Sequence, residues 1–292
     1  MRKPSLLIQH DETAKIGGVD GKKVFVIDNT GNQIIKFIPT VDDGQEIRQA
    51  LNEILSTYSA TVSVDSKQKS LLKFGSRTTT GTGWETMMTL LGTETEETLL
   101  ATNGITTIVS DAADTVPMKV EYHTISGGLL AFGVQDVTLN GTTPVGLPTA
   151  CARASRMYNN DGAALTGNVY VYEGGTRTAA NTHLSIAAGE QQTQKAATSI
   201  SNMDYWIVTN VSINVLSKNT KYAEARLEIR PVGKTYWRPI TQIFSCTDST
   251  GTIQLMFEPH KIIPSNHDVR LAVKTNTSGV DVSGGLQGYL AN

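Results

Sequence analysis

Few side chains in this sequence have the types and spacing that catalysis or metal binding requires. The histidines form no HExxH motif and no i, i+4 pair on a helix; they are His10, His123, His183, His260 and His267. His260 and His267 flank the turn EPHKIIPSNHD, where a metal pair remains an alternative to a surface loop. We predict a chain without a metal site and without a cofactor.

The Gly- and Thr-rich segment GSRTTTGTGW, residues 75–84, is similar to a phosphate-binding loop in composition alone. It lacks the Gly-Lys-Ser/Thr ending of such a loop, and no helical pattern follows it. We therefore predict a turn that leads into a strand containing Trp84.

Nucleophilic chemistry has no support in the sequence, because there is no Gly-x-Ser-x-Gly elbow and no Cys/His cluster. Cys151 and Cys246 could pair, but we predict two buried thiols. Carboxylates gather at 94–97, in a polar loop, and at 42–43, where they cap a helix. A polysaccharide-degrading enzyme that uses two carboxylates stays open as an alternative, because a β-sandwich can hold such a pair across a substrate. We predict no catalytic residues.

Aromatic and basic side chains meet in KTYWRPI, residues 234–240. Such a group could stack on a base or a sugar, but aromatic residues and Arg are also enriched where proteins meet. We therefore assign a candidate interface to Tyr158, Tyr236, Trp237 and Arg238. A glycan-binding role for the three aromatic residues is the alternative.

The charge of the chain is nearly balanced, with 25 Lys and Arg against 27 Asp and Glu in 292 residues. No long-range field therefore recruits nucleic acid or a membrane, and we expect neither as a partner. Charged residues make up only 18% of the chain, while Thr, Ser, Asn and Gly are plentiful, which is typical of β-rich extracellular or virion proteins. The apolar run in the first residues, MRKPSLLIQHDE, is too short for a signal peptide. We therefore expect a soluble protein made in a cytoplasm.

The first 60 residues are predicted to form a small α+β module. The runs 24–27 and 33–38 read as a β-hairpin, and residues 43–58 follow a helical pattern with a capping box. The apolar face of this helix, which is too short to be stable alone, is the candidate anchor of an attachment module: Ile47, Leu51, Ile54, Leu55 and Tyr58. We place a linker at 61–69.

From residue 70 to residue 292, short β-type runs alternate with turn signals, which predicts a mainly β fold with one antiparallel β-sandwich. Alternation is clearest at 225–230, where apolar residues face a core and charged ones face water or a neighbour. In LSIAAGEQQTQKAATSIS, residues 184–201, the period-two pattern predicts a hairpin-like pair of strands with a small, neutral face.

Several segments, taken in order, are similar to a family of virion proteins of tailed bacteriophages. HLSIAAGEQQTQKAATSISNMDYWIV resembles that family's strand, Gly-centred turn, Gln-Gln-Thr and second strand. The preceding segments MKVEYHTI, VQDVTLNGTTPVGL and ARASRMYNNDGAALTGNVYVY, and the later segments ARLEIRPVGKTYWRPITQIF, FEPHKIIPSNHDVRLAV and DVSGGLQGYL, follow the same pattern. The similarity covers residues 70–292 and rests on the order of the segments.

The resemblance implies a jelly-roll-like β-sandwich with a structural role and no catalytic residues. It implies a capsid decoration or cement protein on the outer surface of the phage head, with the major capsid protein and itself, as a homotrimer, for partners. A receptor- or glycan-binding fibre of the virion is the alternative position.

Overall fold

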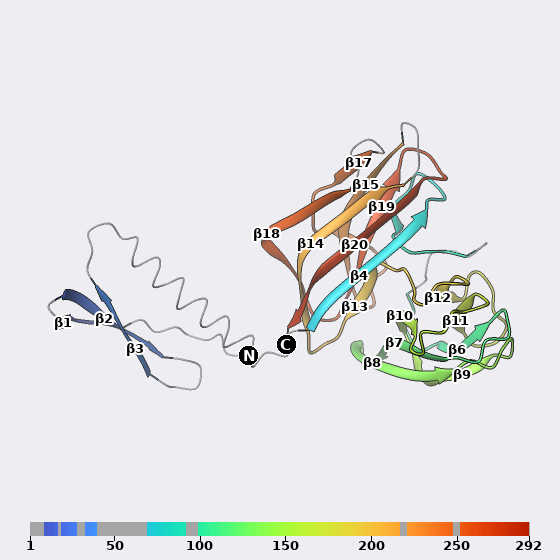
Figure 1. Ribbon diagram of the computed structural model, residues 1–292, viewed down its shortest axis with the longest axis horizontal. Helices are drawn as coiled ribbons and strands as arrows, with labels where there is room; N and C mark the ends of the chain where they lie inside the picture. Colours follow the sequence, from blue (N-terminus) through green and yellow to red (C-terminus); the bar gives the residue numbers. More distant parts are fainter. Residues whose placement is uncertain are drawn as a thin grey trace. The chain divides into compact units, whose positions relative to one another are not determined.

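The computed structural model describes residues 9–16, 19–27, 33–39, 69–91, 99–216, 221–247 and 252–291, and the chain divides into two compact units, 1–67 and 68–292 (Figure 1). In the first unit, β1 (Gln9–Ile16), β2 (Val19–Ile27) and β3 (Gln33–Pro39) form an antiparallel sheet in that order. The predicted helix at 43–58, with Ile47, Leu51, Ile54, Leu55 and Tyr58, lies outside the described residues.

In the second unit, the described residues contain no helix, and the prediction of a mainly β, antiparallel fold is confirmed. One pair of sheets, the host sandwich, is built from both ends of this unit. Its first sheet has the order β18 (Ile253–Ile263), β14 (Tyr205–Val215), β20 (Asp281–Ala291), β4 (Lys69–Thr78). Its second sheet has the order β13 (Ala197–Ile200), β19 (His267–Thr275), β15 (Tyr222–Pro231), β16 (Arg238–Pro239), with β17 (Phe244–Thr247) on β15 and β5 (Glu85–Thr86) on β19.

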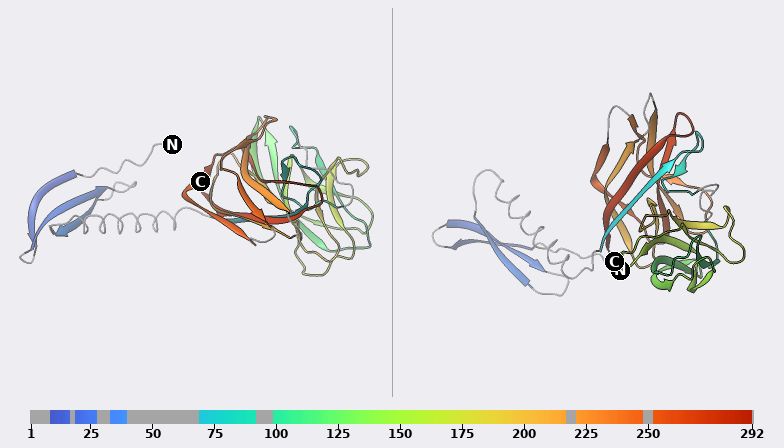
Figure 2. Two further views of the ribbon diagram at one scale, coloured as in Figure 1. Left: turned by 90° about the horizontal axis from the view of Figure 1, so that it is seen from above. Right: turned by 45° about the vertical axis from the view of Figure 1, so that its right-hand side comes forward.

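Residues 105–186 lie in the chain between β5 and β13 of the host sandwich and form an inserted sandwich. Figure 2 shows it beside the host sandwich. One of its sheets has the order β12 (Thr182–Ile186), β11 (Val169–Glu173), β6 (Ile105–Ser110), β9 (Val145–Cys151). The other has the order β10 (Arg153–Asn159), β7 (Pro117–Ser126), β8 (Leu129–Thr138).

Each sandwich has its own hydrophobic core. Trp206, Leu227 and Leu271 are fully buried in the host core, and Ile108 and Met157 in the inserted core. The second unit thus differs from the single sandwich expected over 70–292. Alternation identifies the buried face of a strand, but it does not say which core that face belongs to.

The segment 184–201 also differs from its predicted hairpin. β12 pairs with β11 of the inserted sandwich, whereas β13 pairs with β19 of the host sandwich. The Gly189 turn therefore does not join two paired strands; the chain crosses from one sandwich to the other. The small neutral face that the sequence predicted is buried here, with Ala196 and Ile200 in the host core.

Both cysteines are buried and form no disulfide, as predicted, with Cys151 in the inserted core and Cys246 in the host core. Because the two cores are built separately, the two thiols are held apart and serve as small apolar side chains.

Gly288 on β20 allows that strand to lie close to β14. A Cβ atom at this position would overlap the carbonyl oxygen of Ile207 and lie 2.7 Å from Nε1 of the buried Trp206. We expect Gly288→Ala to lower the free energy of unfolding by about 1–3 kcal/mol through overpacking. Gly83→Ala, where a Cβ meets nothing within 4 Å, is the matched control and should change it little. Equal urea midpoints for the two variants would contradict this explanation.

Candidate functional site

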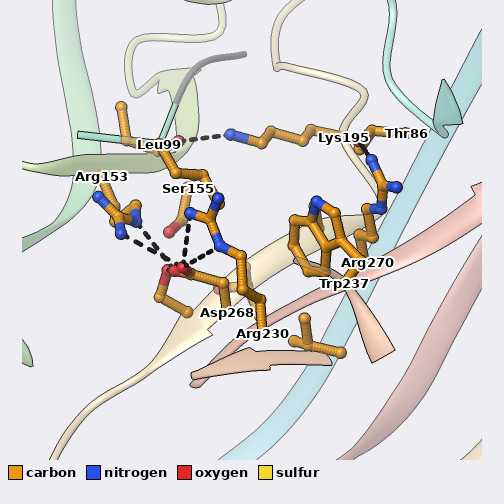
Figure 3. Close-up of a pocket in the computed structure, with 14 residues that line it drawn as sticks. Thr86, Leu99, Arg153, Ser155, Lys195, Arg230, Trp237, Asp268 and Arg270 are labelled. Atoms are coloured by element: carbon orange, nitrogen blue, oxygen red, sulfur yellow. Dashed lines mark hydrogen bonds and ion pairs between the residues drawn. The ribbon is translucent and has the colours of Figure 1, made fainter. Parts of the chain in front are cut away.

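A buried carboxylate, Asp268 on β19, collects charged partners from both sandwiches (Figure 3). Arg153 on β10 of the inserted sandwich binds it in a bidentate manner, with Nε 2.9 Å from Oδ1 and Nη2 3.2 Å from Oδ2. Arg230 donates from Nη2 to Oδ2 at 3.0 Å, and Ser199 donates from Oγ to Oδ1 at 2.7 Å. Both oxygens of the Asp268 carboxylate thus accept hydrogen bonds, which a buried negative charge requires.

A second buried carboxylate, Glu228 on β15, extends this arrangement along the same sheet face. Arg226 Nε lies 2.6 Å from Oε1, and Arg270 Nε lies 2.8 Å from Oε2. The guanidinium of Arg226 is 3.9 Å from the centre of the Trp84 ring, and that of Arg270 is 4.4 Å from the centre of the Trp237 ring. Charged and aromatic groups therefore alternate along the face that the sequence predicted to be wet or to meet a neighbour.

Further polar contacts join the two sandwiches. Lys73 on β4 of the host sandwich lies 3.1 Å from Glu121 on β7, which also pairs with Arg156 at 3.4 Å. Lys195 donates from Nζ to the carbonyl oxygen of Ala154 at 2.9 Å. Burial lowers the pKa of Lys73, while the neighbouring Glu121 favours its charged form. Together with the Asp268 cluster, these bonds fix one sandwich against the other.

The cavity between these groups has a volume of only about 40 Å³. Figure 3 shows Arg153, Arg230 and Asp268 turned toward one another at its edge, with Trp237 and Arg270 beside them. Space of this size admits water molecules but no organic substrate. We therefore interpret the Asp268 cluster as a joint between the sandwiches and not as a reaction site.

His123 on β7 lies beside this joint and is 2% exposed. Burial lowers its pKa to about 3; the positive charges of Lys73, Arg153 and Lys195 act in the same direction, and Asp268 opposes them. The ring of Phe132 packs edge-on against it, with 5.4 Å between the ring centres. His123 is therefore neutral at physiological pH.

Asp114 is a buried carboxylate inside the inserted sandwich. Burial raises its pKa, but hydrogen bonds from the Ser110 hydroxyl, from the Thr166 amide and hydroxyl and from the Gly167 amide outweigh burial and hold the pKa at about 2. These bonds tie the end of β6 to the loop before β11, so Asp114 has a structural role.

The candidate interface residues lie on different sandwiches. Tyr158 is half-buried on β10, with the Arg156 guanidinium 4.6 Å from the centre of its ring. Tyr236 is 59% exposed and Arg238 is exposed on β16. Trp237 is half-buried, and the guanidinium groups of Arg230 and Arg270 lie 5.1 Å and 4.4 Å from the centre of its ring.

Residues 75–78 of the segment 75–84 belong to β4, and residues 79–84 form the turn that leads to β5, so Trp84 precedes the strand that was predicted to contain it. The main-chain amides of Thr80 and Gly81 in this turn donate to the Glu85 carboxylate at 3.1 Å and 2.9 Å, and Arg77 pairs with the same carboxylate. A side chain of the protein thus occupies the position that an anion would take in a phosphate loop.

The side chains of His260 and His267 each bond, through Nδ1, to a nearby main-chain carbonyl, those of Phe257 and Ser265, at 2.8 Å. Within the described ranges, no group of three or more His, Cys, Asp or Glu side chains is placed to hold a metal ion. The acidic residues at 42–43 and 94–97 lie outside the described residues. Among the residues that the structure describes, no helix could cross a membrane.

A different kind of surface covers the outer side of the sheet β18-β14-β20-β4, whose strands lie side by side in Figure 1. Among the described residues, eleven line a groove of about 410 Å³ there, and none of these eleven is charged. They are Leu72, Phe74, Gly75, Gln194, Asn210, Ser212, Gln254, Ser283, Gly284, Gly285 and Gln287. This groove could not be predicted from the sequence, because most of its residues meet only through the register of four strands.

Neither a protein-family model nor a curated protein matches this chain. Two solved structures of infectious bursal disease virus, one of virus-derived T=1 particles and one of the Gt strain, align with 77% of the chain at 13% identity. The alignments cover 69% and 72% of the viral chains, with TM-scores of 0.22 and 0.21. Similarity at this level does not establish a common fold.

Proposed function

We propose that this protein is a non-enzymatic structural component of a tailed-phage particle, a capsid decoration protein that binds and stabilises the assembled head as a homotrimer. The major capsid protein and further copies of the chain are its partners, and the outer surface of the head is its location. The order of family-like segments over 70–292 is the basis for naming the particle.

The observation that carries the proposal is the joint around Asp268, with the Lys73–Glu121 pair beside it. A protein that reinforces a shell must keep its shape under load, and a buried, fully paired network between two sandwiches resists their displacement. Antiparallel two-sheet sandwiches are also the architecture from which jelly-roll domains of viral capsids are built. Symmetric trimers would add avidity, because several weak contacts then act together on one shell.

The location is tested by imaging particles at a resolution that places each protein. We expect copies on the outer head at a fixed ratio to the major capsid protein. Copies confined to the tail or to fibres would overturn the head assignment and favour the receptor-binding position.

Removal of residues 1–60 tests the attachment module. We expect the shortened chain to fold, because residues 68–292 form a compact unit with two cores of their own, and to lose its binding to heads. Co-sedimentation with heads that lack the protein measures this, with the full chain as control. Undiminished co-sedimentation would place the attachment surface within residues 70–292.

A further inference from the structure

The groove on the sheet β18-β14-β20-β4 follows from the register of its strands. Ser212 pairs with Gln254 on one side and with Gly285 on the other, and Gly285 pairs with Phe74. The four residues thus form one row across the sheet, on its outer side. Since Ser212 and Gly285 carry the smallest side chains of this row, the surface is hollowed over the two central strands.

The next row across the sheet has longer side chains and forms one wall of the groove. The row consists of Met256, Asn210, Gln287 and Leu72, of which the last three line the groove. Asn210 donates from Nδ2 to Gln287 Oε1 at 3.0 Å, which leaves the Asn210 oxygen as an acceptor and the Gln287 NH₂ group as a donor. This wall of the groove therefore presents both donors and acceptors from neutral groups.

The apolar side chains of the groove, Phe74 and Leu72, stand on the edge strand β4 and are 37% and 57% exposed. The lining residue on the other edge strand, β18, is the polar Gln254. A protein–protein interface usually has the opposite order, with apolar residues at its centre and polar residues at its rim. A polar centre beside an apolar edge fits a ligand that carries hydroxyl groups along its length and C–H faces for stacking.

We propose that this groove binds an uncharged oligosaccharide. Its volume of about 410 Å³ falls in the range of small-molecule sites. Side-chain amides of Asn and Gln can accept from one sugar hydroxyl and donate to another, and the Phe74 ring offers a face for a pyranose ring. None of the described lining residues is charged, which disfavours acidic glycans, because these would need basic partners.

This binding activity goes beyond a structural role in the particle and does not depend on it. If the protein lies on the outer head, the groove would let particles adhere to neutral surface glycans. It also differs from the glycan site suggested by Tyr158, Tyr236 and Trp237, which involves other surfaces of the chain.

The test uses the purified full chain on an array of neutral oligosaccharides, namely gluco-, manno- and galacto-hexaoses, with heparin and hyaluronan fragments as acidic probes. The best neutral probe is then titrated by calorimetry. We expect binding to a neutral probe that does not change with salt concentration, because no ion pair forms. The double variant Asn210→Ala/Gln287→Ala and the variant Phe74→Ala should each weaken it about tenfold, as expected for lost hydrogen bonds or lost stacking.

Ser212→Tyr fills the hollow and should abolish binding; because the side chain of Ser212 points to the outer surface, this variant is expected to fold, which circular dichroism checks. Tyr236→Ala removes an exposed aromatic residue elsewhere and should leave the affinity unchanged. The proposal is overturned if no neutral probe binds, if only acidic probes bind, or if Trp237→Ala abolishes binding while the groove variants retain it. A change of oligomeric state in the groove variants without glycan binding would assign the groove to a second copy of the chain and also overturn it.

Discussion

Asp268→Ala is expected to lower the free energy of unfolding by about 3–5 kcal/mol, the range for removal of one partner from a buried ion pair. The carboxylate is 1% exposed and accepts hydrogen bonds from Arg153, Arg230 and Ser199. Without it, two guanidinium groups lose the carboxylate that compensates them inside the protein. Urea-induced unfolding of the wild type and the variant measures the difference.

Glu224→Ala is the matched control for this experiment. Glu224 lies on β15, and its carboxylate pairs with Lys274 at 3.7 Å, but the two side chains are 27% and 40% exposed. A pair so accessible to solvent contributes about 0–1 kcal/mol. If Asp268→Ala proved no more harmful than Glu224→Ala, the Asp268 cluster would not be what holds the sandwiches together.

A double-mutant cycle separates the pairwise coupling from general damage to the fold. Arg153→Met and Asp268→Ala should show a coupling energy of at least about 1 kcal/mol, because the two side chains share a bidentate contact. Additive effects would mean that Arg153 contributes through its packing alone.

The class of the fold and the faces of many strands could be predicted from the sequence. In β15, Ala225, Leu227 and Ile229 are buried in the host core, as alternation indicated. The pattern could not tell what covers the opposite face. There Glu228 is fully buried, and its carboxylate is paired with Arg226 and Arg270 of the same sheet.

The joint itself escaped prediction because its members are far apart in the chain. Arg153 and Asp268 are separated by 115 positions, and the local sequence around either residue does not indicate that the other is its partner. The uncharged groove poses the same difficulty, since Phe74 and Gly285 become neighbours only when β4 pairs with β20. Local patterns specify strands, whereas both sites depend on the order and register in which the strands assemble.

Acid is expected to destabilise the protein through His123, before most carboxylates are protonated. The folded pKa of His123 is about 3, compared with 6.5 for an unperturbed histidine. Between these pH values the unfolded chain binds a proton that the folded chain does not, so stability falls as the pH falls. For one proton the slope is about 1.4 kcal/mol per pH unit. Asp114 acts in the same direction at lower pH, between 3.8 and about 2.

His123→Gln should remove this contribution, because Gln takes up no proton. We expect the slope of unfolding free energy against pH to decrease by about 1.4 kcal/mol per pH unit, the value for one proton, between pH 6.5 and 3. This change does not depend on the variant's stability at neutral pH. His260→Gln, which replaces an exposed histidine, is the comparison variant. A wild-type slope in His123→Gln would show that His123 takes up its proton equally in the folded and unfolded chains. Since Lys73, Arg153 and Lys195 all disfavour a charge at this position, loss of the slope would tie acid sensitivity to the joint between the sandwiches.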